Sequence, residues 1–537
     1  MFTDQGESMR NFHLPGRSAV IATNGICATS HPLAARTAVD VMAQGGNAVD
    51  AALAAAFMLN ICEPQMTGLG GDCFVLIKPA GQERIIALNG SGRAPAGLDP
   101  EALRAKGHDA MPIRDVAAVT IPGAVDAFCR LSDDWGSWEL ARVLDPAIRA
   151  ADQGVPVAER TAADWAIAAR EGYLSGHARE IYLQNGRAPK VGDLFRAPMQ
   201  ADVLRRIARD GRAGFYQGEV AEDMVRSLRA LGGPHGEADF AATACTCDDP
   251  ISTVYRDVEL VEHPPNGQGA TALLMANILS HFDLASLDPT SAARVHLEAE
   301  AARLAYDARD RFLADPDYMT RLEHMLAPET ASALAARIDP HRAMALPVAA
   351  TSDAVHKETV YLTVIDRDRM AVSLIYSIYH SFGSGLASQK FGILFQNRGA
   401  GFTLEKGHPN EAGGGKRPMH TIIPAMLRQE GRVLAPFGVM GGAYQPTGHV
   451  HVLSNLVDFA MSPQAAIDAP RSFPDGHVLK LEQGFSPDVA AALEIMGHKV
   501  EVPEMPLGGG QMIRIDHDRG ILIGASDPRK DGCAIGF

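Results

Sequence analysis

Long apolar runs are absent from this sequence. The longest, AALAAAFMLN at 51–60, falls well short of the ~20 apolar residues that a membrane-spanning helix needs, and Asp50 and Glu63 flank it. The first twenty residues also lack the basic stretch followed by an apolar stretch that marks a secretion signal. We therefore expect no membrane partner and a cytoplasmic location.

Cysteine is scarce, and positive charge is in deficit. Seven cysteines are spread from Cys27 to Cys533, and an odd number in a long chain argues against a disulfide framework. Cys245 and Cys247 form an isolated C-x-C, which we interpret as packed or surface thiols. The formal net charge is −15, which disfavours nucleic acid and anionic membranes as partners.

Cofactor signatures are missing as well. No H-E-x-x-H occurs, GGGKRP at 413–418 lacks the spacing of a phosphate loop, and GLGGD at 68–72 lacks the offsets of a dinucleotide fingerprint. His449 and His451 lie one residue apart, but two histidines alone are usually packing or surface residues rather than metal ligands. We expect neither a metal nor an organic cofactor.

What is present is a large globular chain of 537 residues, 46% hydrophobic and 21% charged, enough for two or three domains or one intertwined unit. Apolar residues at three- and four-residue spacing predict helices over 31–44 and 47–60. Glycine turns and apolar runs predict an antiparallel strand pair at 67–79 and 85–95. Residues 130–330 are predicted to be mostly helical.

The pattern changes after residue 330. Residues 330–358 contain Pro, Ala and Ser and end in a polar stretch, so we predict an exposed, flexible connector there. Strands are expected from residue 359 onward, with a helical stretch at 447–466 between them.

A hairpin opens this second part of the chain. TVYLTVID at 359–366 alternates with period two, and MAVSLIYSIY at 370–379 follows after a three-residue loop. In that register Asp366 pairs with Met370, and Thr359 lies opposite Ser377. Directly opposed Cβ atoms are ~5 Å apart, so the two hydroxyl groups could interact. A two-residue loop would spoil this pairing.

A set of motifs spread over nearly the whole chain resembles the gamma-glutamyltransferase (gamma-glutamyltranspeptidase, glutathione hydrolase) family of N-terminal-nucleophile hydrolases. Each motif is weak alone, but they occur together, in order and at suitable spacing. They are ATSHPLAARTAVDVMAQGGNAVDAALAAAF, EPQMTGLGGDCFVL, TIPGAVDAF, the TVYLTVID hairpin, FGSG, GKRP, the GG of VMGG, and GASDPR.

The resemblance implies an inactive precursor that cuts itself between Glu358 and Thr359. It implies a large fragment, 1–358, and a small fragment, 359–537, which assemble as a heterodimer. The implied fold is α+β, a four-layer αββα sandwich formed jointly by both fragments.

The resemblance also assigns roles. Thr359 is the implied nucleophile, its freed α-amine the base, and Ser377 a hydroxyl that orients it. Gly441 and Gly442 match the pair whose backbone N–H groups hold the oxyanion. A free α-amine titrates near pH ~8, so a modest shift makes it a base at neutral pH.

The substrate clamp of the family is largely replaced here. Ser91 stands at the place of the arginine that binds the α-carboxylate, with Arg93 two residues on, and Tyr379 replaces an asparagine. Further replacements are Arg398 for a glutamine, Gly401 for the aspartate that binds the substrate amine, and His420 and Thr421 for two serines. An arginine without that aspartate suits an anion that has no α-ammonium group. Alternatively, Arg398 forms a structural ion pair.

These replacements are similar to a side branch of the family that resembles oxamate amidohydrolase. Three hypotheses follow. The first is hydrolysis or transfer of gamma-glutamyl compounds such as glutathione, and the second is hydrolysis of a small carboxylate-bearing amide such as oxamate. The third is an unprocessed, non-catalytic binding or scaffold protein on the same fold.

Overall fold

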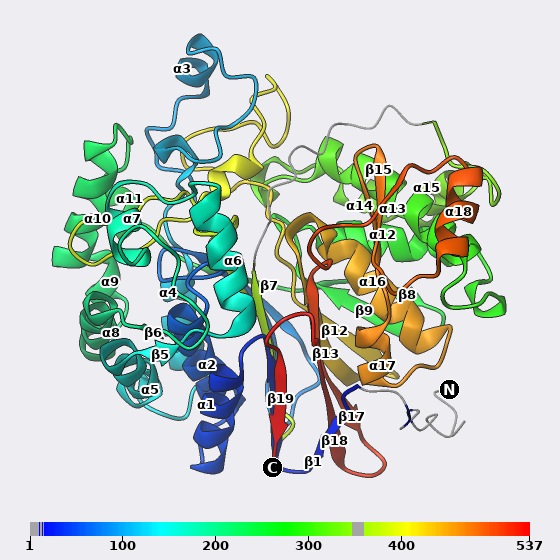
Figure 1. The fold of residues 1–537 in the computed structure, drawn as a ribbon, viewed down its shortest axis with the longest axis horizontal. Coiled ribbons are helices and arrows are strands. Elements are labelled where there is room, and N and C mark those ends of the chain that lie inside the picture. Colours follow the sequence, from blue (N-terminus) through cyan, green and yellow to red (C-terminus); the bar gives the residue numbers. More distant parts are fainter. Residues whose placement is uncertain (1–9, 11–12, 14–15, 346–358) are drawn as a thin grey trace.

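A computed structural model describes residues 10, 13, 16–345 and 359–537 (Figure 1). The fold is a mixed α+β one built around two seven-stranded sheets in which every pairing is antiparallel. Sheet A has the order β1 (Val20–Ala22), β18 (Ile521–Ser526), β17 (Gly509–Asp516), β13 (Arg432–Met440), β12 (Ala425–Gln429), β9 (Val258–Glu262) and β8 (Ile251–Tyr255). Sheet B has the order β19 (Cys533–Gly536), β2 (Gly25–Thr29), β10 (Val360–Asp366), β11 (Ala371–Ser377), β3 (Asp72–Lys78), β4 (Ile86–Gly90) and β7 (Thr246–Asp248).

The two sheets pack against each other through a buried apolar cluster. It joins side chains of sheet B, such as Ile26 and Leu76, to side chains of sheet A, such as Met426 and Ile513. Two small sheets lie apart from this pair: β5 (Val155–Pro156) with β6 (Leu194–Phe195), and β14 (Ser472–Asp475), β15 (Val478–Leu481) and β16 (Val500–Glu501).

Helices accompany both sheets, on opposite sides of the molecule in Figure 1. On the side of sheet B these are α1 (Pro32–Ala43), α2 (Ala48–Cys62), α3 (Pro100–Ala105), α4 (Ala124–Trp135), α5 (Leu140–Gln153), α6 (Glu159–Arg170), α7 (Gly176–Tyr182), α8 (Pro198–Asp210), α9 (Ala213–Tyr216), α10 (Gly218–Ala230) and α11 (Glu237–Ala241). On the side of sheet A they are α12 (Gly269–Leu279), α13 (Ala292–Phe312), α14 (Leu322–Leu326), α15 (Pro328–Ala335), α16 (Gln445–Val457), α17 (Pro463–Asp468) and α18 (Pro487–Ile495). Helix α2 is buried along its whole length, which explains why its sequence is almost uniformly apolar.

Several expectations from the sequence are confirmed. The two N-terminal helices lie where the spacing of apolar residues placed them, and β3 and β4 are antiparallel neighbours. The helical stretch after residue 445 is present as α16 and α17. All seven cysteines are free. No helix within the described residues has the length and apolar character to cross a membrane.

The prediction of a mostly helical segment at 130–330 is confirmed, although the segment also contains the short strands β5 to β9, of which β8 and β9 form a hairpin that extends sheet A. One expectation is wrong in part. The predicted connector starts too early, because α15 continues to Ala335 and packs beside α12. Residues 346–358, the rest of that connector, lie outside the described residues.

The hairpin of β10 and β11 has the predicted register. Val360 pairs with Tyr376, and at the other end the Asp366 N–H donates to the Met370 carbonyl at 3.2 Å. The loop ends on Arg369 with φ of 61°, the left-handed residue that a three-residue hairpin loop requires. Strand β10 is central, between β2 and β11, and all its residues are buried. Thr359 therefore immediately precedes a rigid, fully packed strand.

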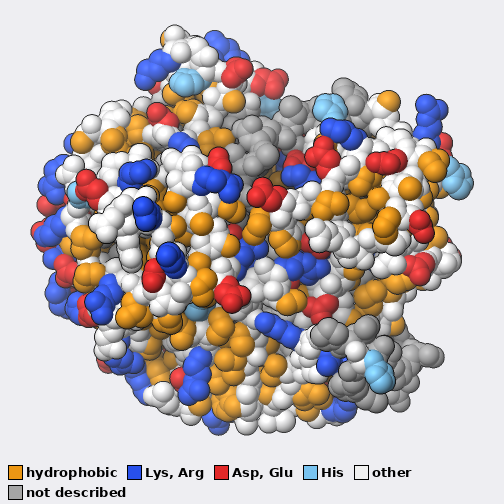
Figure 2. Space-filling view, viewed as in Figure 1, with side chains coloured by type: hydrophobic (Ala, Val, Ile, Leu, Met, Phe, Trp, Pro, Cys, Tyr) orange, Lys and Arg blue, Asp and Glu red, His pale blue; other side chains and the backbone are white. Residues whose placement is uncertain are grey.

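The surface carries both signs of charge. In the face seen in Figure 2, basic and acidic side chains are interspersed and gather into no extended basic stripe.

Candidate active site

Thr359 and Ser377 meet at the open end of the β10–β11 hairpin. The Thr359 hydroxyl donates to Ser377 Oγ at 3.3 Å, and Thr359 is 2% exposed. Ser377 Oγ also accepts the Tyr379 backbone N–H at 2.8 Å. That local hydrogen bond accompanies the φ of 80° at Tyr379, which lies in the left-handed region that few residues other than glycine adopt. The hairpin register thus brings the two predicted hydroxyl groups together.

Arg398 joins this pair. Its Nη2 donates to Ser377 Oγ at 3.4 Å and its Nη1 to Thr421 Oγ1 at 2.9 Å, and the guanidinium lies 4.0 Å from the centre of the Tyr379 ring. Arg398 is fully buried, and its Nε has no hydrogen-bond partner among the described residues. Burial disfavours the charged form and lowers the pKa of Arg398 to about 10. The guanidinium stays charged at neutral pH, and within the part of the chain that the structure describes its hydrogen bonds go to hydroxyl oxygens rather than to a carboxylate.

His420 lies beside this cluster as a neutral imidazole. Its Nε2 lies 3.2 Å from Asp72 Oδ2, and both residues are fully buried. Burial, together with the nearby charge of Arg398, lowers the pKa of His420 well below its usual value. Because the Ile422 backbone N–H points at Nδ1 from 3.4 Å, the proton belongs on Nε2, which donates it to Asp72.

Asp72 is a functional candidate that the sequence reasoning missed. Its Oδ1 accepts the backbone N–H groups of Gly92 at 2.8 Å and Gly123 at 3.2 Å, and Nε2 of Gln396 at 2.9 Å. Burial raises the pKa of Asp72 to about 6, although these donors and Arg398 oppose the shift. The signal in the sequence is an acidic residue at the end of the GLGGD glycine turn, where a buried strand begins.

Gly441 and Gly442 follow the last residue of β13. Their φ values of 119° and 58° are both in the left-handed region, which suits glycine. Gln268, also missed from the sequence, ties this turn to the Arg398 cluster. Its Nε2 donates to the carbonyl of Gly442 at 2.9 Å and to the carbonyl of Thr421 at 2.6 Å.

A cavity of about 800 Å³ adjoins the cluster. Its wall includes Tyr379 and Thr421, which both contact Arg398, and it includes Gly441 and Gly401. Gly441 and two side chains that contact Arg398 therefore lie at one cavity that has room for a substrate.

Two predicted binding residues are not brought into the Arg398 cluster. The Ser91 hydroxyl donates to Asn89 Oδ1 at 2.7 Å. Arg93 pairs with Asp315 at 3.2 Å and donates to the Gly415 carbonyl at 3.0 Å, and its side chain is 41% exposed. Their neighbour Gly92 does reach the site, through its hydrogen bond to Asp72.

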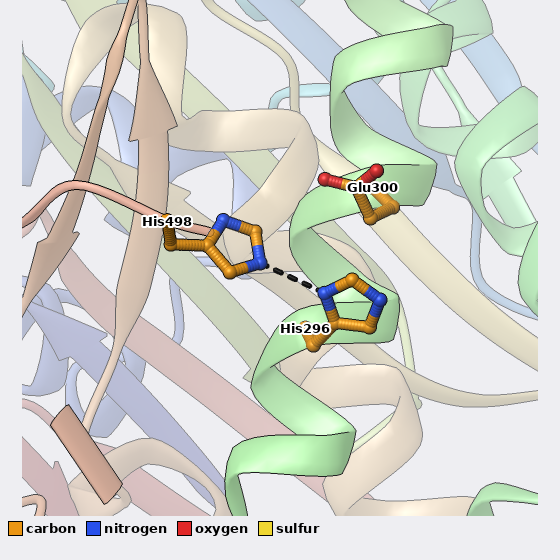
Figure 3. Close-up of side chains that lie close together, drawn as sticks. All are labelled: His296, Glu300 and His498. Carbon is orange, nitrogen blue, oxygen red and sulfur yellow. Dashed lines mark hydrogen bonds between the residues drawn. The ribbon is translucent and has the colours of Figure 1, made fainter. Parts of the chain in front are cut away.

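One group of possible metal ligands lies elsewhere, at His296, Glu300 and His498 (Figure 3). His296 Nε2 donates to the Asp339 carbonyl at 2.7 Å, so its Nδ1 accepts from His498 Nε2 at 2.8 Å. Glu300 is already paired with Arg303 at 2.8 Å. The charge that would attract a cation is balanced by this arginine, and we interpret the group as a hydrogen-bond network.

The two histidines weighed in the sequence also have protein partners. His449 Nδ1 lies 2.7 Å from Glu262, and His451 Nδ1 lies 3.1 Å from Glu298. His449 Nε2 accepts the Val439 backbone N–H at 3.1 Å, two residues before Gly441. These contacts give His449 a packing role under β13 rather than the role of a metal ligand.

Comparison with known proteins decides the family. The family model described as "Gamma-glutamyltranspeptidase" matches residues 34–537. The chain belongs to the gamma-glutamyltranspeptidase family. It is 34% identical to the Glutathione hydrolase-like YwrD proenzyme of Bacillus subtilis, over 97% of this chain and 99% of that protein. It is also 34% identical to the Oxamate amidohydrolase proenzyme of Klebsiella pneumoniae, over 97% of this chain and 100% of that protein.

The solved structures agree. The crystal structure of cephalosporin acylase from Bacillus halodurans has a TM-score of 0.91 and 37% identity, and the match covers 99% of both chains. As a member of the gamma-glutamyltranspeptidase family, the protein is an N-terminal-nucleophile amidohydrolase of the kind made as a proenzyme. These relatives are named for different substrates, although their sequence identities to this chain are nearly equal.

The glycine turn allows a first test, the substitution Gly441→Ala. The added Cβ would lie 3.0 Å from the Gly508 Cα, at a φ of 119° that alanine rarely adopts. We expect kcat to fall by up to about 100-fold, because the clash would displace the backbone N–H that the family resemblance implies for the oxyanion, and loss of one such donor typically costs ~3 kcal/mol. Steady-state kinetics on the processed enzyme measure the effect.

The matched control is Gly431→Ala. Gly431 also has a positive φ, 78°, but an added Cβ there meets no atom within 4 Å. This variant shares the backbone strain and lies in the turn between β12 and β13, so it should lose stability and keep kcat. Equal loss of kcat in both variants would contradict a specific role for Gly441.

Proposed function

We propose that this protein is an autoprocessing threonine amidohydrolase that acts on a small amide whose acyl group carries a carboxylate and no α-ammonium group, such as oxamate. The observation that carries this proposal is the buried Arg398, which shares the Ser377 hydroxyl with Thr359 and has an unpartnered Nε among the described residues. A buried guanidinium without a carboxylate partner is a ready site for an anion.

Processing would divide the chain between Glu358 and Thr359 into fragments 1–358 and 359–537. Glu358 and the bond itself lie outside the described residues. The fragments would remain together as a heterodimer with an αββα arrangement of layers, since β10 and β11 of the small fragment pair with β2 and β3 of the large one. The relatives named proenzymes support the same reading.

In the reaction, the Thr359 α-amine takes the proton of Oγ1, and Oγ1 attacks the amide carbonyl carbon. The glycine turn at Gly441 and Gly442 would hold the carbonyl oxygen as it becomes negative. The C–N bond then breaks and the leaving amine takes the proton, which leaves an ester on Thr359. Water, deprotonated by the α-amine of Thr359, then hydrolyses the ester and restores the Thr359 hydroxyl.

The short separation of nucleophile and anchor favours a short acyl group. Thr359 Oγ1 and Arg398 Nη2 contact the same oxygen, at 3.3 and 3.4 Å, so the two atoms lie within about 7 Å of each other. In oxamate the reacting carbonyl is bonded directly to the carboxylate. In a gamma-glutamyl group two methylene groups and the α-carbon separate them.

The charge balance also favours an acyl group without an ammonium. Asp72 contacts His420 beside the cluster, and it already accepts hydrogen bonds from Gly92, Gly123, Gln396 and His420. A substrate ammonium group that bound to Asp72 would have to break these hydrogen bonds. Gamma-glutamyl hydrolysis is the competing candidate, which the relatives named glutathione hydrolases support.

The test compares the two substrates on purified, processed enzyme. We expect release of ammonia from oxamate and little or no release of p-nitroaniline from gamma-glutamyl-p-nitroanilide. The opposite pattern would select gamma-glutamyl chemistry. A chain that stays whole after long incubation and hydrolyses neither would support the non-catalytic scaffold instead.

A further inference from the structure

Asp72 lies in line with the proposed nucleophile and its orienting hydroxyl across sheet B. Strands β10, β11 and β3 are neighbours in sheet B, and in their registers Ser377 pairs with Asp72 and stands opposite Thr359. Directly opposed residues of antiparallel strands point to the same face, with Cβ atoms ~5 Å apart. The proposed nucleophile, its orienting hydroxyl and this carboxylate therefore form one row across the sheet.

The row ends beside the buried charge of Arg398. Asp72 contacts His420, and the next residue, Thr421, accepts a hydrogen bond from Arg398. Burial sets both net pKa shifts, but the two charges oppose it: Arg398 limits the rise in the pKa of Asp72, and Tyr379 and then Asp72 limit the fall in the pKa of Arg398. Among the described residues, Asp72 is therefore the carboxylate whose charge acts on Arg398 when no ligand is present, although the two form no direct ion pair.

The other groups around Asp72 carry no negative charge that could balance Arg398. Gly92, Gly123 and Gln396 are uncharged donors, and the phenol of Tyr376 and the thiol of Cys73 have pKa values raised well above their ordinary values by burial. His420 is neutral, and Arg417 adds positive charge from farther away. The arriving anion and Asp72 would thus compete for one guanidinium.

We propose that the Asp72–His420 pair is a proton-linked counter-charge, which balances Arg398 in the empty pocket and takes up one proton when a substrate carboxylate replaces it. This inference rests on the proposed function. The charges balance in both states: Arg398 with ionised Asp72 before binding, and Arg398 with the substrate carboxylate and a protonated pair after binding. Solvent supplies the proton.

The sign of the pH dependence follows. Binding raises the proton affinity of the pair, so the anion binds most tightly below the pKa of Asp72 in the empty site, which is about 6. Above that pH each step of one unit should weaken binding by up to about tenfold. If Asp72 only held the loops of Gly92 and Gly123 in place, anion affinity would show no such slope.

The experiment uses processed wild-type enzyme and pyruvate, a monoanion that keeps a carboxylate beside a carbonyl but has no amide to cleave. Titration calorimetry at pH 7 in two buffers of different ionisation enthalpy gives the number of protons taken up. We expect close to one proton for the wild type, and affinity that falls between pH 6.5 and 8. Binding with no proton uptake would overturn the proposal.

The matched variant is Asp72→Asn, which keeps the shape and one acceptor oxygen. It should bind pyruvate more tightly than the wild type at pH 8, with no proton uptake, because its neutral amide does not compete with the pyruvate carboxylate for Arg398. Proton uptake equal to that of the wild type would also overturn the proposal. If pyruvate and oxamate fail to bind the wild type at all, the proposed function itself fails, which is a distinguishable result.

Discussion

Thr359→Ala is expected to leave the purified protein as one uncut chain without amidase activity. Removal of Oγ1 takes away both the atom that would attack the bond before residue 359 and the atom that would form the acyl-enzyme. Activity should fall below about 10⁻⁴ of the wild type, as for other enzymes that lose their nucleophile. Intact mass spectrometry and N-terminal sequencing check the cut, and an oxamate assay checks the activity.

Two variants control this result. Thr359→Ser keeps a hydroxyl and should still cut the chain, at a reduced rate. Thr363→Ala removes another buried hydroxyl of β10, one that donates to the Val372 carbonyl at 3.0 Å, and should cost stability while it spares cleavage. Cleavage before residue 359 in Thr359→Ala would contradict the assignment of the nucleophile. A Thr363→Ala protein that folds but is not cleaved would contradict it as well.

Arg398→Met is expected to separate substrate binding from processing. Methionine keeps the apolar stem but has no donor for the substrate carboxylate. Loss of one partner of a buried charge pair costs about 2–5 kcal/mol, so kcat/KM for oxamate should fall by about 100-fold or more. The loss should appear mainly in KM, because the carboxylate is held in both the ground state and the transition state.

The chain should still cut itself in this variant, since Thr359 and Ser377 remain. Arg36→Met is the control, because Arg36 lies on α1 with its side chain 68% exposed and pairs with Asp40 one turn away. It should keep full activity. Unchanged oxamate kinetics in Arg398→Met would remove the reason to propose a carboxylate-bearing substrate.

Local patterns predicted the parts of the fold that depend on neighbours in the sequence. Period-two alternation and loop length were enough to pair Val360 with Tyr376, and the glycine pair at 45–46 marked the boundary between α1 and α2. Strands β8 and β9 were missed because they are short and their burial depends on the edge of a distant sheet. The contacts of Arg93 were missed for the same reason, since Asp315 is far away in the sequence.

The candidate site shows the same division between features set by local sequence and features set by contacts between distant segments. By itself the sequence determined the hairpin that sets Thr359 opposite Ser377 and the glycine turn, because these are matters of residue type and short spacing. The family resemblance added that Arg398 stands in place of a glutamine and Gly401 in place of an aspartate. Only the tertiary structure decided that Arg398 is buried against that hairpin, and that Asp72 and Gln268 join the site. Burial and charge balance are sums over residues from distant segments, so they exist only once the sheets have packed.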